Sequence, residues 1–505
     1  MKQHNGKSKH TTCLLFDDAP ILHKHRVRVA IQVPQRDSEP VIVPEHPWEV
    51  NRWGGDPGMS VLQDDDGSCH LWYMLKYEDQ DASVGQLAAG DLDEKTRNDL
   101  LSCTRYILCY ATSPDGVHWV KPELDVLGFG DRQRTNIVLT GRLGGTVFLD
   151  PNAAPESRLK MIYGGGNRLP HLLPGETESS RSIYHAIYGA ESGDGVHWRQ
   201  TREPILPWYT DTTNVAYWDD QRERYVAHVR WNAGMVYRDG RTVVEDPRFH
   251  RAVGRSESRD FFRFPPPECI LTPPDELWQP YETGTDYYNT AAMKYPFAPD
   301  AYFLFVSFFH HDTGMVDVHL ASSRDGIGYT IHPEPFLSPG CAGSFDAGSI
   351  YMAAGIIDQG DEFSMYYRGY EHIHGAPLHP ANSFETVDRP VGIGRLRCRK
   401  DGFVAQVFDR EGGGIVTHLV EVTGATLTVN VDAGAGGTLE VAVLDEDEQP
   451  IPGFSFQEAV PIRGNSVSAP VKWTAQGSLA DLIGRRVHLR IVGADAKLYA
   501  FRFGD

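Results

Sequence analysis

The sequence predicts an all-β protein made of a five-bladed β-propeller followed by a C-terminal β-sandwich. Fifty glycines and 33 prolines among 505 residues favour many turns and few long helices. A unit of about four strands recurs five times, and a run of evenly spaced alternating strands without that repeat follows it. We therefore assign residues 1–405 to the propeller and residues 406–505 to a jelly-roll-like accessory sandwich.

The repeat is recognised by a polar turn in its second half. The sequence ATSPDGVHW at 111–119 returns as ESGDGVHW at 191–198 and ASSRDGIGY at 321–329, and more loosely at 254–264 and 394–403. Each copy follows an alternating strand and leads through the turn to an aromatic residue that begins another short strand. The turn aspartates are Asp115, Asp194, Asp260, Asp325 and Asp401.

A second series of aspartates is expected to precede the first strand of each unit. Its members are Asp56, Asp150, Asp211, Asp286 and Asp346. After each comes a short strand, a turn and a more apolar strand, such as those at 70–76, 225–230 and 302–308. Four-stranded units arranged radially bury their faces on their neighbours as propeller blades, and the segment 26–33 is expected to close the ring. A pair of all-β sandwiches with ordinary hairpins is the alternative.

The charge and apolar content of the chain argue against nucleic-acid-binding and membrane-spanning classes of protein. A net charge of −20 argues against a nucleic-acid partner, because no positive field attracts phosphates. No stretch approaches the roughly 18 apolar residues of a membrane span, so no membrane partner is expected. The absence of an apolar leader at the start and seven scattered cysteines predict a cytoplasmic location, with a secreted mature form as the alternative. The oligomeric state is not indicated.

Propeller geometry predicts where the acidic residues meet. The start of a blade's first strand and the end of its second lie on the same face beside the axis. The five aspartates of the second series should therefore surround one funnel. The residues that end the second strands should join them, and these are Lys76, Asn167, Arg230, His310 and Arg368, with Glu371 just beyond.

Such a ring suits glycosidic bond cleavage. When two carboxyl groups lie close together, the charge of one raises the pKa of the other, so one can stay protonated while its neighbour is ionised. Cleavage of a glycosidic bond needs such a pair, with one protonated acid and one ionised carboxylate. Each aspartate has a simpler alternative, which is to cap a turn by accepting backbone hydrogen bonds. The appended sandwich is expected to buttress the propeller, because no exposed aromatic cluster is evident in it.

The motifs also carry a family resemblance. RWGGDPGM at 52–59, followed by HLWY at 70–73, resembles the WMNDPNG…HLFY signature of the invertase and levanase glycoside hydrolases, and VFLDP at 147–151 is similar to their RDP motif. Those enzymes share a five-bladed propeller with the arabinanase and xylosidase families. The sequence also resembles a group of bacterial propeller proteins with a PWE opening, found here at 47–49. The resemblance implies a glycosidase that cleaves a terminal or short-oligosaccharide bond.

Residue roles follow from that resemblance. It implies that Asp56 is the nucleophile or general base and that Asp150 stabilises the transition state. In that family a Glu-Cys motif in the third blade supplies the general acid, and this sequence has no such motif at the matching position. Asp211, Asp286 and Glu371 are therefore all candidates for the general acid. The remaining candidates are expected to hold substrate hydroxyls or stack on sugar rings, and they are Trp53, Lys76, Asn167, Asn214, Arg230, Tyr287, His310, Asp346 and Arg368.

The expected partner is a carbohydrate substrate, and no cofactor or catalytic metal is expected. The histidines at 308–313 and 370–375 serve more simply as pocket walls than as metal ligands. A structural calcium or other cation in the funnel is the alternative, because a ring of oxygens suits it. Two rival functions stand beside hydrolysis. One is a non-catalytic carbohydrate-binding or scaffold propeller, and the other is a glycoside phosphorylase or transglycosylase.

Overall fold

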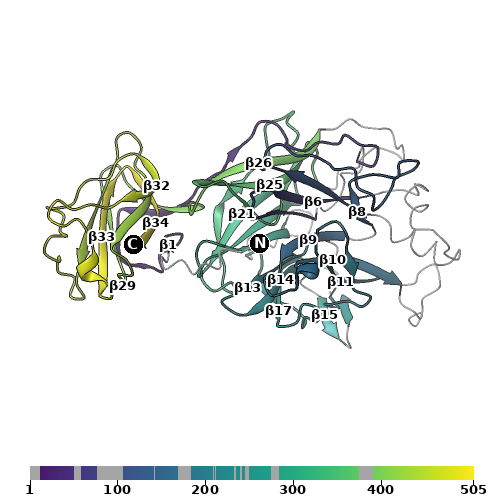
Figure 1. Ribbon diagram of the computed structural model, residues 1–505, viewed down its shortest axis with the longest axis horizontal. Helices are drawn as coiled ribbons and strands as arrows, with labels where there is room; N and C mark the ends of the chain where they lie inside the picture. The colour runs from purple at the N-terminus through teal and green to yellow at the C-terminus, as the bar shows by residue number, and fades with distance from the viewer. Residues whose placement is uncertain are drawn as a thin grey trace.

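A computed structural model describes residues 12–49, 58–76, 106–140, 143–168, 183–208, 210, 212–232, 235–238, 241–244, 250–274, 284–374 and 390–504. Strands dominate these ranges, and the only helices found within them are short 3-10 turns such as η1 (Pro155–Ser157) and η4 (Ala480–Leu482). The predicted all-β class is confirmed. Figure 1 shows a large group of sheets and, beside it, a smaller unit containing the C-terminal strands in yellow.

Five antiparallel meanders of four strands build the larger part. Meander 1 contains β5 (Met59–Gln63), β6 (Cys69–Lys76), β7 (Tyr106–Ser113) and β8 (Ile137–Thr140). Meander 2 contains β9 (Leu143–Leu149), β10 (Leu159–Arg168), β11 (Ile183–Ser192) and β12 (Arg199–Gln200). Meander 3 contains β13 (Val215–Asp219), β14 (Arg224–Asn232), β17 (Arg251–Ser258) and β18 (Glu268–Leu271), with a hairpin of β15 (Met235–Arg238) and β16 (Arg241–Val244) inserted after β14.

The last two meanders belong to one sheet, joined by a parallel bridge between Val316 and Ser349. Meander 4 contains β19 (Thr285–Lys294), β20 (Tyr302–His310), β21 (Val316–Ser323) and β22 (Thr330–Leu337). Meander 5 contains β23 (Ser349–Met352), β25 (Glu362–Tyr370), β26 (Val391–Arg399) and β4 (Gln35–Arg36), with β24 (Ile357–Asp358) also paired to β25.

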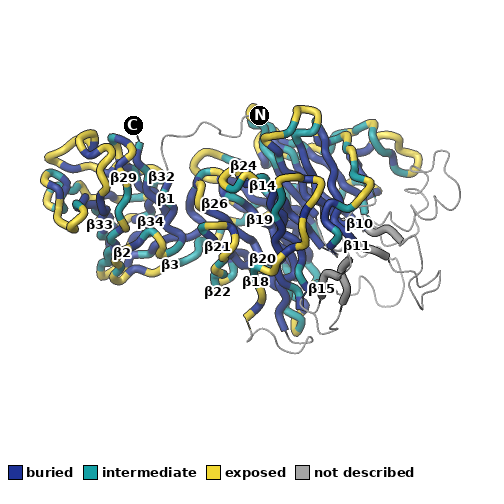
Figure 2. Tube along the Cα trace, turned by 90° about the horizontal axis from the view of Figure 1, so that it is seen from below, coloured by how far each residue is buried: buried dark blue, intermediate teal, exposed yellow. Residues whose placement is uncertain are grey.

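The first strands of the meanders are neighbours in a closed order. Strand β5 contacts β9, β9 contacts β13, β13 contacts β19, and β19 contacts β23. The order closes where Ser60 in β5 pairs with Ala354, just after β23. Apolar residues of adjacent meanders pack between them, so buried strands run through the whole of this part in Figure 2.

The repeated Asp turn joins each meander to the one before it. In meander 2 the Ser192 hydroxyl accepts the Gly195 amide at 2.9 Å, and Asp194 accepts the amides of Val196 and His197. Gly195 has a φ of +78°, which a glycine adopts without strain. Its carbonyl then accepts the Trp72 indole N–H of meander 1 at 2.7 Å. The turn recognised in the sequence is therefore a docking element between sheets.

The C-terminal unit consists of two antiparallel sheets around one apolar core, which includes Val429, Val443 and Ile491. One sheet contains β1 (Thr12–Leu14), β3 (Val27–Ile31), β27 (Val404–Phe408), β34 (Ala496–Gly504), β30 (Thr426–Asp432) and β32 (Asn465–Pro470). The other contains β2 (Ile21–His25), β28 (Gly413–Thr417), β33 (Arg486–Ala494), β29 (Val420–Glu421) and β31 (Thr438–Leu444).

The N-terminal segment departs from expectation. Residues 27–31 pair with β27 in the C-terminal unit, so the prediction that 26–33 closes the ring is wrong. Instead Gln35 and Arg36 pair with β26 and supply the fourth strand of meander 5. The strand after the Asp401 turn, β27, has left the meander, which also moves the start of the C-terminal unit ahead of residue 406.

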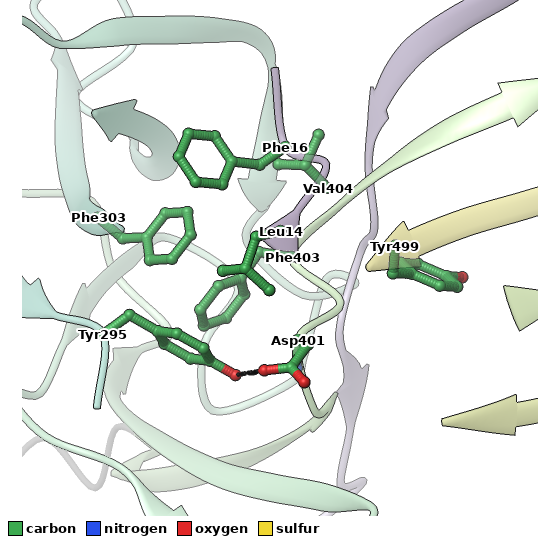
Figure 3. A pocket seen from close by; sticks show the side chains of 8 residues that line it. All are labelled: Leu14, Phe16, Tyr295, Phe303, Asp401, Phe403, Val404 and Tyr499. Carbon is green, nitrogen blue, oxygen red and sulfur yellow. Dashed lines mark hydrogen bonds between the residues drawn. The ribbon is translucent and has the colours of Figure 1, made fainter. Parts of the chain in front are cut away.

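A cluster of aromatic side chains joins the C-terminal unit to meanders 4 and 5 (Figure 3). Leu14 and Phe16 lie beside Phe303 and Phe403. At its edge Tyr295 donates its hydroxyl to Asp401 Oδ1 at 2.8 Å and accepts the Asp401 amide at 2.9 Å. Burial raises the pKa of Asp401, although the Tyr295 hydrogen bond and the Arg502 charge act in the opposite direction.

Replacing Asp401 by Asn should stabilise the protein at pH 8. The raised pKa means that folding favours the protonated acid, a contribution that is complete below pH 3.8 and is lost as the pH rises through the folded pKa. Asn keeps an acceptor for Tyr295 and tolerates the φ of +57°. Thermal unfolding should give a Tm a few degrees above wild type at pH 8 and no gain at pH 4, with exposed Asp447→Asn as the control. A lower Tm at pH 8 would contradict this account.

Candidate functional site

The starts of the first strands converge on Gly144 at the beginning of β9. A Cβ on Gly58 would lie 2.4 Å from the Gly145 nitrogen, and one on Gly144 would lie 2.3 Å from the Thr212 carbonyl oxygen. Gly144 has a φ of +60°, so both its conformation and its surroundings require glycine. Asp56 and Asp211 lie outside the described residues, but the chain that follows each of them, at Gly58 and Thr212, reaches the same glycine pair.

At the same end of meanders 3 and 4, a buried carboxylate is surrounded by basic groups. Asp286 in β19 is 0 % exposed. It accepts Arg251 Nη1 at 2.6 Å and the Arg251 amide at 3.1 Å, and it hydrogen-bonds His311 Nε2 at 2.9 Å. Burial opposes its ionisation, but His311 and Arg251 prevail and hold the pKa of Asp286 below the ordinary value. Asp286 is therefore an ionised anchor and cannot supply a proton at neutral pH.

An aromatic and cationic layer extends this anchor towards meander 5. The Arg230 guanidinium donates to the Tyr288 carbonyl at 2.7 Å and lies 4.4 Å from the centre of the Tyr288 ring. The Arg251 guanidinium lies 5.0 Å from the same ring. His374 contacts Tyr288 and hydrogen-bonds the Tyr351 hydroxyl through Nδ1 at 2.6 Å. Burial, assisted by Arg251 and Arg230, lowers the pKa of His374 to about 4, so its imidazole is neutral.

Arg368 in β25 connects meander 5 back to meander 1. It is 1 % exposed and donates Nη1 to the Met74 carbonyl at 2.7 Å. The Met74 sulfur in turn accepts the Gly144 amide at 3.0 Å. All five meanders thus contribute to one group of residues at the start of their first strands. We call it the strand-start cluster, and its described charged and aromatic members are Arg230, Arg251, Asp286, Tyr288, His311, Tyr351, Arg368 and His374.

Asp150 does not belong to this cluster, and the expectation that it begins a first strand is wrong. It follows the end of β9 and accepts the Tyr225 hydroxyl at 2.7 Å. Tyr225 lies near the start of β14, whereas the strand-start cluster lies at the other end of that strand, beside Asn232. The seven residues between Tyr225 and Asn232 span about 23 Å. The next pair of meanders repeats the arrangement, since Tyr302 donates to Asp219 at 2.9 Å. Asp150 therefore holds neighbouring meanders together at their far ends.

The replacement Asp150→Asn tests this placement. The amide keeps an acceptor for Tyr225 but removes the charge, so the free energy of unfolding should fall by about 1–2 kcal/mol. Tyr225→Phe removes the hydrogen bond altogether and should cost about 1–3 kcal/mol in urea unfolding. An unchanged free energy of unfolding in both variants would contradict this placement of Asp150.

Asn214 and Tyr287, two further candidates, are buried and make their contacts within the protein. Asn214 is buried, its side chain accepting the Thr210 hydroxyl and donating to the Thr212 carbonyl. Tyr287 is buried against Phe308 with ring centres 4.7 Å apart, so it packs in the core, and neighbouring Tyr288 lies in the cluster.

Asp346 is bound on the opposite side of β25 from Arg368. Its carboxylate accepts Arg36 Nη1 at 2.8 Å, the Tyr367 hydroxyl at 2.7 Å and the Ser344 hydroxyl at 2.7 Å. Tyr367 and Arg368 are successive strand residues, so their side chains face opposite ways. Asp346 thus anchors the N-terminal strand β4 to meander 5.

The last candidates are only partly described. His310 ends β20 and hydrogen-bonds Asp317 at 3.2 Å, which raises the pKa of His310 despite its burial. Glu371 is half-buried directly after β25. Lys76 ends β6 and Asn167 lies near the end of β10, as expected, but their side chains lie outside the described part of the chain, as does the whole of Trp53.

Sequence reasoning missed Arg251, Tyr288, His311, Tyr351 and His374. Two of them gave a signal, because His311 and His374 lie in the histidine motifs at 308–313 and 370–375 that were interpreted as pocket walls. Arg251 begins a third strand, whereas the sequence repeat predicts site residues only on first and second strands. Strand β17 runs antiparallel to β14 and pairs Arg251 with Asn232, so its start lies at the end where the second strand finishes.

Within the described ranges, no three His, Cys, Asp or Glu side chains gather closely enough to hold a metal ion. Nor does this part of the chain contain a helix long and apolar enough to cross a membrane.

Comparison with known proteins gave matches only among solved structures. No family model and no curated protein match the sequence. A structure described as a glycoside hydrolase is 13 % identical, with a TM-score of 0.43 over 73 % of this chain and 92 % of its own. A thermostable family-43 glycoside hydrolase is 13 % identical, with a TM-score of 0.38 over 71 % and 92 %. A beta-1,2-mannobiose phosphorylase from Listeria innocua is 12 % identical, with a TM-score of 0.42 over 77 % and 96 %. Glycoside hydrolases are thus among the solved structures that this chain resembles.

Proposed function

We propose that the protein is a glycoside hydrolase whose five meanders are the blades of a β-propeller and whose site is the strand-start cluster. The observation that carries the proposal is the burial of Asp286, Arg230 and Arg368 at the strand-start end of the meanders. At the same end the chain leads from Asp56 into β5 and from Asp211 into β13. Charged groups are expensive to bury, so a mixed cluster of carboxylate and guanidinium groups marks a candidate site.

The division of roles follows from burial and protonation. Asp56 is the proposed nucleophile or general base, and the proposed general acid is Asp211 or Glu371. Asp286 is ionised and fully covered, so its proposed role is to position Arg251 and His311, which contact the substrate. Tyr288 and the guanidiniums beside it would bind sugar hydroxyls and a ring face.

Glycoside phosphorolysis is the second candidate, and a specific feature favours it. Arg230 and Arg251 both lie within about 5 Å of one ring, together with His311 near Arg251. Guanidinium groups recognise phosphate through paired hydrogen bonds. An inorganic phosphate would then replace water as the nucleophile at the sugar carbon.

The replacement Asp56→Asn should lower turnover about a thousandfold or more, because it removes the nucleophile or base. Wild type and variant would be tested on a panel of aryl furanosides and pyranosides, each with and without phosphate. The Tm should stay within a few degrees, and exposed Asp66→Asn, from the same meander, is the matched control. Turnover that requires phosphate would identify the phosphorylase, and unchanged phosphate-independent turnover in Asp56→Asn would contradict the hydrolase mechanism.

The positioning role of Asp286 makes a separate prediction. Asp286→Asn should lower kcat/KM about 10–100-fold, as loss of a group that orients others does. Arg251→Lys should cause a similar loss. Because both changes disrupt one interaction, the double variant should lose little more than either single variant. Additive losses in this double-mutant cycle would show that the two residues act independently.

A further inference from the structure

A cavity lies between meander 5 and the C-terminal unit. Its volume is about 390 Å³, within the range of roughly 300–1,000 Å³ that is usual for small-molecule sites. The linker before β4, the end of β26, the start of β32 and strand β34 all line it. We call it the joint groove.

The joint groove is remote from the strand-start cluster. Its wall includes Glu362 at the beginning of β25, which pairs with Arg399, whereas Arg368 lies six residues further along β25. Six strand residues correspond to about 20 Å. A ligand in the joint groove would therefore not contact the residues of the proposed catalytic site.

The lining of the groove is strongly polar and electrically balanced. Three carboxylates line it, from Asp361, Glu362 and Asp432. Three cations also line it, from Arg397, Arg399 and Lys497. Amides and a hydroxyl from Gln32, Gln35, Asn465 and Ser466 add both donors and acceptors.

Several of these groups are held in place by neighbours. Arg399 donates Nε to Asn430 Oδ1 at 2.7 Å and lies 4.7 Å from the centre of the Tyr499 ring. Lys497 donates Nζ to Gln32 Oε1 at 2.8 Å. Side chains fixed before a ligand arrives lose less conformational freedom on binding, which favours affinity.

This balance selects the chemistry of the ligand. The three carboxylates and the three basic groups cancel, so the groove has no net charge that would favour an anion or a cation. An apolar ligand would strip water from six charged side chains without replacing their hydrogen bonds. A neutral polyhydroxylated molecule can donate to the carboxylates and accept from the cations at the same time.

We infer that the joint groove is a binding site for a neutral oligosaccharide, separate from the strand-start cluster. Such a site would hold a second part of a glycan, or a second glycan, against the junction of the two units. The C-terminal unit then contributes β32 and β34 to ligand binding as well as supporting meander 5.

The test uses calorimetric titration of the full chain with xylohexaose, arabinohexaose and mannohexaose, and with hexagalacturonate as the charged comparison. Titrations in Asp56→Asn prevent the proposed turnover from consuming the probes. Ser466→Trp fills the groove, and Ser468→Trp is the matched control, because Ser468 is an exposed serine of the same strand that does not line the groove. If Ser466→Trp does not fold, Gln35→Trp, on the linker side of the groove, replaces it.

We expect at least one neutral hexasaccharide to bind, and its affinity to fall about tenfold or more in Ser466→Trp but not in Ser468→Trp. Turnover of a small aryl glycoside should be equal in both variants. Binding that is insensitive to Ser466→Trp, or confined to hexagalacturonate, would overturn the inference, as would the absence of binding by any neutral probe. Loss of glycosidase activity from the whole panel would instead count against the proposed function and leave these titrations unaffected.

Discussion

The close approach of the first strands around Gly144 is the constraint on which the rest of the structure depends. Neighbouring sheets can come this near only where a side chain is missing, and a Cβ on Gly58 or Gly144 would collide with backbone atoms. Their approach brings the starts of β5, β9 and β13 to one place, and β19 and β23 complete the closed order of first strands. Residues at those starts then share a small volume, so carboxylates and guanidiniums far apart in the chain must be paired there.

The two ends of the meanders use similar residues for different purposes. At the strand-start end, Asp286 is bound by Arg251 and His311. The carboxylate therefore stays ionised, and its charge holds these two side chains in position. At the far end, Asp150 is bound by Tyr225, a neutral donor that joins two sheets without adding charge. An aspartate beside a strand therefore has a role that depends on which end of that strand it occupies.

This distinction explains what could be predicted from the sequence. The repeat of Asp turns was sufficient for the four-strand units, because the turns at Asp115, Asp194 and Asp325 make the same hydrogen bonds with the same Ser, Asp and Gly atoms. The position of Asp150 was not predictable, since Asp-Pro fits the beginning and the end of a short strand equally well. Arg251 was hidden for a different reason: it begins a third strand, which starts at the cluster because β17 runs antiparallel to β14 and pairs Arg251 with Asn232. The pairing of β3 with β27 depends on contacts between residues almost four hundred positions apart, which local pattern does not encode.

The exchange of strands between the two ends of the chain has a consequence for biosynthesis. Strands β1 and β3 pair with β34 and β27, and β4 completes meander 5. An emerging polypeptide therefore carries these early segments without their partners until nearly all of it has been translated. Contacts of such long sequence separation slow folding. The first strands made are among the last to find their places, and during synthesis their unpaired edges are open to wrong partners or to chaperones.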